Sequence, residues 1–479
     1  MKKILFVGAE VMPFAATGGL GDVLGSLPAA MKKEYKDDID IRVVMPLYDM
    51  ISEEWRTQMK LEAVFNLQLS WRNLYCGVKS LIKDGVTYYF IDNEYYFKRG
   101  SLYGHFDDGE RYAYFCKAAI EMMSVLDFYP DVLHAHDWQA ALSIAYLNFN
   151  YRYKKEYQDI KTVFTIHNIE YQGKYSFDIM GDIFGFGDYA REYLEYEGCM
   201  NLMKCAIEMA NAVTTVSPRY ADEIKGVEHS HGLALILNRN AHKLSGILNG
   251  IDYEYYDPEK DKVIPQNFSS DSIDKKAVNK TELQKSLGLP QREDVPMIAI
   301  ISRLASHKGL DLVRDVAYRV LDNYDAQLVV LGKGEADYES FFAGLENNKN
   351  DKARALIKYD RDLSKKIYAA ADLFVMPSKS EPCGLSQMIA SRYGAVPIVR
   401  ETGGLFDSIK GYWLRDGEIL GNGFTFANYS SDELYDRICA AIGLYYDKEL
   451  YRRFVKKIME TDFSWSVSAR RYNELYNRL

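Results

Sequence analysis

The first half of the chain alternates short apolar runs with longer segments in which apolar residues recur at helical spacing. Each apolar run ends in polar residues, glycine or proline, as strands buried on both faces do. We expect strands at 4–9, 39–46, 87–93, 131–137, 162–168 and 212–218. Strands that alternate with helices predict an α/β fold with parallel strands and crossover helices.

A polar, proline-punctuated stretch, 258–295, separates this series from a second one. It predicts a connection between domains, with one helix near 275–287. The second series predicts strands at 297–303, 327–334, 371–378 and 395–401, and residues 463–479 predict a terminal amphipathic helix. At 479 residues the chain exceeds the size at which a single core stops growing. The two series therefore predict two doubly wound domains.

Composition and charge narrow the classes of function. The formal net charge of -9 disfavours nucleic acid or an anionic membrane surface as the main partner. No apolar run approaches the roughly 20 residues of a membrane span. The start, MKKILFVGAEVMPF, is typical of a first buried strand rather than of a signal peptide. The six cysteines form no CxxC pair, which favours free thiols, so we expect a cytoplasmic protein.

Polar side chains stand at or near the ends of the predicted strands. In doubly wound sheets a ligand site forms outside the carboxyl ends of the strands. His134 and His136 share one face of a strand, because side chains alternate along it, and we expect a structural role for at least one of them. The full set at strand ends is His134, His136, Asp137, His167, Asn168 and Ser217.

A glycine-rich segment, TGGLGDV (17–23), follows the first strand. A dinucleotide-binding fingerprint needs a third glycine after Gly19 and Gly21, and Leu24 stands there instead. The backbone N–H groups of Thr17, Gly18 and Gly19 can approach a diphosphate at a helix start. The same residues suit a tight strand-to-helix turn, and the loop alone favours neither interpretation.

Two cations, Arg303 and Lys308, follow the first strand of the second domain. They can neutralise a diphosphate without a metal ion. The alternative is a solvated basic pair, but positive charge near a helix N-terminus is unfavourable without an anion. His229 and His231 are a weak metal signal without further ligands nearby, so we expect no metal site.

Two further segments follow strands of the second domain. Glu381 is predicted to open a helix, where its carboxylate can accept hydrogen bonds from sugar hydroxyls or cap the helix. The N–H groups of Cys383, Gly384 and Leu385 can donate to a ligand oxygen. A cysteine at a helix start can be reactive, but packing of a small residue explains Cys383 at least as well. RETGGLFDSI (400–409) carries a second glycine pair that suits close approach of the backbone to a ligand.

Together these segments resemble the bacterial glycogen synthases and plant starch synthases, which transfer glucose from ADP-glucose to an α-1,4-glucan. The resemblance spans nearly the whole chain and rests on TGGLGDV, DVLHAHDWQAAL, FTIHNIEYQG, TTVSPRYADEI, GILNGIDYEYYDP, SRLASHKGLDLV, EPCGLSQ, RETGGLFDSI and FSWSVSARRY, in this order. It implies the GT-B fold, in which two Rossmann-like domains face each other across a deep cleft. The expected ranges are 1–257 for the acceptor-side domain, 258–295 for the connection, 296–460 for the nucleotide-sugar domain and 461–479 for a helix that crosses back to the first domain.

The resemblance also implies the reaction and its residues. It implies a retaining glycogen (starch) synthase that uses no cofactor or metal, with ADP-glucose as donor and the non-reducing end of glycogen as acceptor. The implied catalytic residues are Arg303, Lys308, Glu381, His167 and Asp137. The implied donor-binding residues are Thr17, Gly18, Gly19, Asp22, Asn249, Cys383, Gly384, Leu385, Thr402, Gly403 and Gly404. Nothing in the sequence predicts an oligomeric state.

One departure from the family pattern concerns the glycine-rich loop. The family loop normally reads KTGGL, and Ala16 replaces its lysine. A charged hydrogen bond contributes roughly 1.5–3 kcal/mol, so we expect about ten- to a hundredfold weaker donor use. Two alternatives remain open, namely a UDP-glucose-using transferase of the same fold and an impaired glucan-binding or regulatory homologue. A dinucleotide oxidoreductase is disfavoured because the fingerprint fails at its third glycine.

Overall fold

The computed structural model describes residues 1–479 and contains two compact units. Unit 1 comprises Met1–Asn249 and Trp465–Leu479, and unit 2 comprises Gly250–Ser464. The stretch 258–295, which the sequence suggested as a connection, lies within unit 2.

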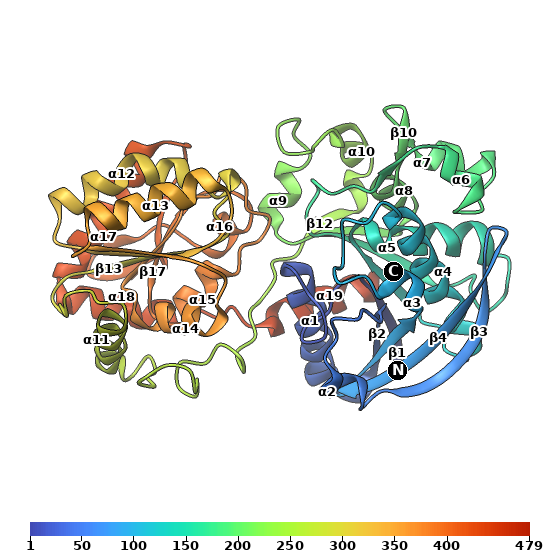
Figure 1. The fold of residues 1–479 in the computed structure, drawn as a ribbon, viewed down its shortest axis with the longest axis horizontal. Coiled ribbons are helices and arrows are strands. Elements are labelled where there is room, and N and C mark those ends of the chain that lie inside the picture. Colours follow the sequence, from blue (N-terminus) through green and yellow to red (C-terminus); the bar gives the residue numbers. More distant parts are fainter. The chain divides into compact units, whose positions relative to one another are not determined.

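Unit 1 is built on a nine-stranded sheet (Figure 1). In spatial order the strands are β12 (Leu244–Gly246), β11 (Ala212–Thr215), β7 (Lys161–Ile166), β6 (Val132–His136), β1 (Lys2–Val7), β2 (Ile39–Pro46), β5 (Val86–Asp92), β4 (Arg72–Lys83) and β3 (Lys60–Leu69). From β12 to β5 the strands run parallel, and β4 and β3 extend the edge as an antiparallel hairpin. All six strands predicted in this half are confirmed.

The sequence analysis missed the β3–β4 hairpin and the short β12. In the hairpin Leu61, Val64 and Ile82 are all more than half exposed. Apolar side chains therefore also lie on the solvated side of this edge, and clean alternation is confined to Phe65–Leu69 of β3. A register shift between Leu61 and Ala63 interrupts the period further.

Helices connect and cover these strands. The longer ones in unit 1 are α1 (Gly19–Tyr35), α4 (Asp108–Val125), α5 (Asp137–Tyr146), α8 (Leu202–Met209) and α19 (Trp465–Arg478). The shorter ones are α2 (Glu53–Arg56), α3 (Glu94–Phe97), α6 (Asp178–Asp182), α7 (Arg191–Leu194), α9 (Pro218–Glu223) and α10 (Ala234–Arg239). A small antiparallel sheet joins β8 (Lys174–Tyr175), β10 (Cys199–Asn201) and β9 (Glu195–Tyr196).

The last helix, α19, belongs to unit 1 although unit 2 precedes it in the chain. It packs beside α1, as the red and blue helices of Figure 1 show, and Arg470 lies 3.6 Å from Glu34 of α1. The hydroxyl of Tyr476 lies 2.7 Å from Nδ1 of His134 on β6. Contacts in the middle and near the carboxyl end of the helix therefore hold it on unit 1.

Unit 2 is built on a six-stranded parallel sheet. In spatial order its strands are β15 (Ala353–Ile357), β14 (Gln327–Gly332), β13 (Met297–Ile301), β16 (Leu373–Met376), β17 (Val396–Arg400) and β20 (Phe424–Phe426). The helices are α11 (Lys276–Ser286), α12 (Leu310–Asn323), α13 (Ala336–Asn348), α14 (Arg361–Ala370), α15 (Ser386–Arg392), α16 (Gly403–Ser408), α17 (Ser431–Tyr446) and α18 (Lys448–Glu460). Figure 1 shows α12 and α13 on one face of the sheet and α14 and α15 on the other. The four strands predicted here are confirmed, and β18 (Trp413–Arg415) and β19 (Glu418–Leu420) form a separate hairpin.

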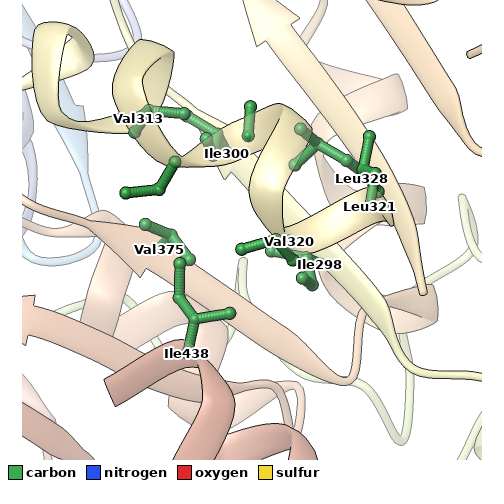
Figure 2. Close-up of a pocket in the computed structure, with 10 residues that line it drawn as sticks. Ile298, Ile300, Val313, Val320, Leu321, Leu328, Val375 and Ile438 are labelled. Atoms are coloured by element: carbon green, nitrogen blue, oxygen red, sulfur yellow. The ribbon is translucent and has the colours of Figure 1, made fainter. Parts of the chain in front are cut away.

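A small cavity remains in the core of unit 2 (Figure 2). Its lining comes from the sheet, α12 and α17, and carries no polar surface: Ile298, Ile300, Val313, Val316, Ala317, Val320, Leu321, Leu328, Val375 and Ile438. An apolar void with room for about one water molecule offers nothing to orient a polar ligand. It is a packing gap rather than a binding site.

Buried polar contacts attach the stretch 258–295 to unit 2. The ammonium of Lys276, on α11, donates to the carbonyls of Tyr368, Ala369 and Tyr393 at 3.1, 2.7 and 2.9 Å. These carbonyls lie at the carboxyl ends of α14 and α15, where helices lack internal partners and favour a cation. Burial lowers the pKa of Lys276 to about 7. Nearer the chain's entry to unit 2, Asp261 pairs with Lys365 of α14 at 3.3 Å.

We predict that Lys276→Met destabilises the protein. The substitution keeps most of the apolar volume but strands three buried carbonyls, so the free energy of unfolding should fall by roughly 2–4 kcal/mol. Lys275 lies next to it and is exposed, so Lys275→Met is the matched control and should change little. Urea unfolding of both variants measures the difference, and equal unfolding curves would contradict the anchoring role.

Candidate active site

The glycine-rich loop of unit 1 runs into the start of α1. Gly18 and Gly19 are exposed, and a Cβ on either would meet no atom within 4 Å. Gly18 has extended backbone angles (φ −163°, ψ −166°) that any residue adopts. Neither packing nor backbone conformation therefore requires glycine at these two positions. Gly21 differs, because its Cβ would lie 2.2 Å from the Cβ of Ala16.

A second cluster lies where β6 and β7 end. Asp137 follows β6 with a left-handed φ of 57°, and its carboxylate accepts a hydrogen bond from the main-chain N–H of His167 at 2.7 Å. The His167 ring lies beside His136, with Nε2 to Nδ1 at 2.9 Å. Parallel pairing of β6 with β7 brings these residues together.

Burial sets the protonation of this cluster. It raises the pKa of Asp137 to about 7, although main-chain N–H groups of His167 and Asn168 favour the ionised form. It lowers the pKa of His167 to about 3, so this ring is neutral at physiological pH. Nε2 of His136 is buried without a hydrogen-bond partner.

His134 has a structural role, as we expected for at least one histidine of this strand. Its Nδ1 lies 2.7 Å from the hydroxyl of Tyr476, and its Nε2 lies 2.6 Å from Oγ1 of Thr165. Both ring nitrogens are thus used to join β6 to α19 and β7. Neither nitrogen is available to a ligand.

Two other residues of unit 1 come from the resemblance alone. Asp22 lies half-buried in the first turn of α1. Asn249 is buried and ends the first of the two segments of unit 1, and its side-chain Oδ1 has no hydrogen-bond partner. A buried carbonyl without a hydrogen bond costs free energy of folding, so Asn249 is suited to accept a hydrogen bond from a ligand.

In unit 2 the predicted cation and carboxylate meet. Nζ of Lys308 donates to Oε2 of Glu381 at 2.7 Å, and the hydroxyl of Ser378 donates to the same oxygen at 3.0 Å. The two charged residues are 73 positions apart in sequence. They meet because Lys308 follows β13 and Glu381 follows β16, which are parallel neighbours. Arg303 also follows β13, and its side chain is exposed.

The helix that we expected to open at Glu381 begins later, at Ser386. Gly384 interrupts it with a φ of 71°, a left-handed conformation that breaks a helix. Glu381 and the buried Cys383 therefore lie in a loop, so Glu381 does not cap α15. Leu385 immediately precedes the helix.

The second glycine pair packs against this loop. A Cβ on Gly403 would lie 2.0 Å from the carbonyl oxygen of Glu381, and one on Gly404 would lie 2.1 Å from that of Cys383. The N–H of Gly404 donates to the Glu381 carbonyl at 3.0 Å. The pair, which follows the buried Thr402, thereby holds the Glu381 loop in place. Contact between these glycines and a donor stays a prediction.

Other features of the structure bear on its chemistry. All six cysteines are free thiols. No three His, Cys, Asp or Glu side chains gather as metal ligands would. None of the helices combines the length and the hydropathy that a membrane crossing requires.

Sequence reasoning did not include two residues that contact the predicted site. Glu10 holds the backbone of Thr17, and Ser378 shares the Glu381 carboxylate with Lys308. Glu10 directly follows a predicted strand and Ser378 is the last residue of another, and this position is the signal that could have identified them.

Comparison with known proteins assigns the chain to a family. Residues 3–239 match the starch synthase catalytic domain, and residues 280–460 match the glycosyl transferases group 1 family. Glycogen synthase from Anoxybacillus flavithermus is 45% identical over 479 residues, covering 100% of this chain and 98% of that protein. The chain belongs to the glycogen synthase family. A glycogen synthase from Clostridium botulinum is also 45% identical, over 480 residues that cover 100% of this chain and 99% of that protein.

Solved structures agree with the sequence families. The catalytic domain of starch synthase IV from Arabidopsis thaliana, solved with ADP and acarbose bound, matches with a TM-score of 0.90 and 35% identity. The match covers 100% of this chain and 99% of that one. Sucrose-phosphate synthase from Thermosynechococcus elongatus shares the fold, with a TM-score of 0.60 and 15% identity. The match covers 100% of this chain and 99% of that one. The predicted resemblance and GT-B fold class are confirmed, and the chain is a glucosyltransferase. The alternatives outside this family are not favoured.

We predict a specific pH dependence from Asp137. Burial raises its pKa from about 4 in the unfolded chain to about 7 in the folded protein. The free energy of unfolding therefore falls as the pH rises through this range, because ionised Asp137 is unfavourable in the folded state. Asp137→Asn removes this decrease. The free energy of unfolding of the variant, relative to the unchanged chain, should therefore rise with pH across this window by at most roughly 1.4 kcal/mol per pH unit. Urea unfolding at pH 4, 5, 6, 7 and 8 measures it, and a flat or falling difference would exclude a protonated Asp137.

Proposed function

We propose that this enzyme transfers glucose from ADP-glucose to the non-reducing end of an α-1,4-glucan, with retention of configuration and without a metal ion. The observation that carries the proposal is the Lys308–Glu381 pair, at the carboxyl ends of β13 and β16, in a chain that matches a starch synthase along its whole length. A nucleotide-sugar donor needs positive charge for its diphosphate and acceptors for its sugar hydroxyls, and this pair supplies both.

The cations of unit 2 act on the leaving group. The bond between the anomeric carbon of glucose and the phosphate oxygen breaks, and a bond from that carbon to the acceptor oxygen forms. The transition state resembles an oxocarbenium ion, so negative charge grows on the departing ADP. Lys308 and Arg303 stabilise that charge, which is the largest single contribution available to such a site. The acceptor hydroxyl passes its proton to the leaving phosphate on the same face, which explains retention without a covalent intermediate.

Glu381 binds the sugar rather than attacks it. Lys308 and Ser378 both donate to Oε2, and this leaves Oε1 to accept from glucose hydroxyls. Because Glu381 is only 7% exposed, its carboxylate is held in one orientation. Gly403 and Gly404 support that orientation by packing on the loop that carries it.

The histidine of unit 1 acts as a neutral hydrogen-bonding group. Nε2 of His167 faces His136, so Nδ1 is the nitrogen that remains for a donor hydroxyl. Asp137 holds the main chain of His167 and thereby the position of its ring. A histidine with a pKa of about 3 does not act as a proton donor at physiological pH.

We predict that Lys308→Ala lowers kcat for ADP-glucose at least about a hundredfold, because one charged contact to the leaving diphosphate is lost. Transfer by the unchanged enzyme should survive EDTA. Lys366→Ala changes an exposed lysine on α14 and is the control, with activity expected to stay unchanged. The measurement is glucose incorporation into glycogen from ADP-glucose and UDP-glucose in parallel. Loss of transfer in EDTA that added Mg²⁺ restores would refute the metal-free mechanism.

We predict that Ala16→Lys raises kcat/KM for ADP-glucose about tenfold or more, because it adds the cation that the family loop carries. Ala16→Met supplies a side chain of similar length without the charge and should give no such gain. The comparison separates charge from bulk. Equal activity of the two variants would show that other cations already suffice for the donor.

A further inference from the structure

The carboxylate of Glu10 occupies the inner side of the glycine-rich loop. Glu10 is only 4% exposed and stands just after β1. It accepts hydrogen bonds from the N–H of Thr17 at 2.5 Å, the hydroxyl of Thr17 at 2.8 Å and the N–H of Gly18 at 3.1 Å. The loop backbone is therefore bound from inside unit 1.

A fourth donor fixes Glu10 itself. The hydroxyl of Tyr103 donates to its Oε1 at 2.6 Å, and burial raises the pKa of this phenol well above its ordinary value. Tyr103 therefore keeps its proton and remains a donor at all physiological pH values. Both oxygens of Glu10 are used, one by the main chain of the loop and one by Tyr103 and the Thr17 hydroxyl.

The segment that carries Tyr103 is fastened on both sides. The fully buried Arg111 donates to the carbonyl of Leu102 at 3.1 Å and pairs with Asp108. The other carboxylate oxygen of Asp108 accepts from the N–H groups of Gly104 and His105 at 2.9 and 3.3 Å. A buried ion pair thus positions Tyr103, Tyr103 positions Glu10, and Glu10 positions the loop.

The outer side of the loop has no such contacts. The positions of a Cβ on Gly18 and Gly19 are open, and α1 begins at Gly19 without a side-chain cap. The loop is thus held rigidly on its inner face and left bare on the face where a helix N-terminus attracts anions.

We propose that Glu10, held by Tyr103, is a positioning residue for the donor diphosphate. It keeps the Thr17–Gly18 backbone in one conformation, so that the start of α1 meets the donor without reorganisation. The inference rests on the proposed function, and it adds Glu10 and Tyr103 to the residues that determine donor use. Contact of Glu10 with the donor is not required.

A purely electrostatic effect of Glu10 on the donor would change donor use in the opposite direction from a positioning effect. A carboxylate near a diphosphate repels it, so if charge were its only effect, Glu10→Gln would improve donor use. Positioning predicts a loss, because an amide cannot accept from all four donors at once. Misplacement of a bound substrate by a fraction of an ångström has large kinetic effects, so we expect kcat/KM for ADP-glucose to fall about ten- to a hundredfold.

Tyr103→Phe is the milder test, since it removes one hydroxyl and keeps the half-buried ring. We expect kcat/KM for ADP-glucose to fall about three- to tenfold, with KM for glycogen unchanged. Tyr157→Phe is the matched control, because its buried hydroxyl donates to the carbonyl of Ile120 at 3.2 Å elsewhere in unit 1. The inference is wrong if Tyr103→Phe and Tyr157→Phe lower kcat/KM for ADP-glucose by the same factor. It is also wrong if neither Glu10→Gln nor Tyr103→Phe lowers that ratio more than twofold.

A second measurement separates this inference from the proposed function. Amide hydrogen exchange at Thr17 and Gly18, without donor, should be at least tenfold faster in Glu10→Gln and Tyr103→Phe than in Tyr157→Phe. This readout needs no catalysis. Failure of the unchanged enzyme to use ADP-glucose would overturn the proposed function, whereas unchanged exchange in both loop variants would overturn the positioning role.

Discussion

Parallel strands that are covered on both faces leave only their ends for chemistry, and the candidate site depends on this constraint. In unit 2 it brings Lys308 and Glu381 to 2.7 Å although 73 positions separate them. In unit 1 it brings the His136–Asp137 step beside His167. The ion pair and the histidine pair are both consequences of neighbouring strands that end at the same edge.

The tetrapeptide TGGL occurs twice in the chain, and its glycines have different surroundings at each place. At residues 402–405 the glycines are demanded by backbone, because a Cβ on Gly403 or Gly404 would lie about 2 Å from a carbonyl oxygen. At residues 17–20 the glycines face open space and the loop is held by a carboxylate beneath it. Gly18 and Gly19 therefore leave their outer face open, whereas Gly403 and Gly404 position the loop that carries Glu381.

Some buried polar side chains of this protein have a structural role. Lys276 donates to carbonyls at the carboxyl ends of two helices, and His134 joins β6 to α19 and β7 through its two ring nitrogens. Lys276 and His134 are of residue types that active sites commonly use. Their hydrogen bonds differ from those of a candidate such as Asn249, since His134 has a protein partner for each ring nitrogen whereas Asn249 keeps a buried oxygen without one.

The sequence by itself determined the α/β class, all ten predicted strands and the family, because alternating apolar runs and ordered motifs are local properties of the chain. It also pointed to Lys308 and Glu381 as candidates, since both follow strands. Only the tertiary structure decided that these two pair, that α15 begins at Ser386, and that Glu10 and Tyr103 hold the loop. The β3–β4 hairpin was likewise missed, because alternation is confined to Phe65–Leu69 and apolar side chains elsewhere in it are exposed. Those features depend on contacts between residues distant in sequence, and no local pattern encodes which distant groups will meet.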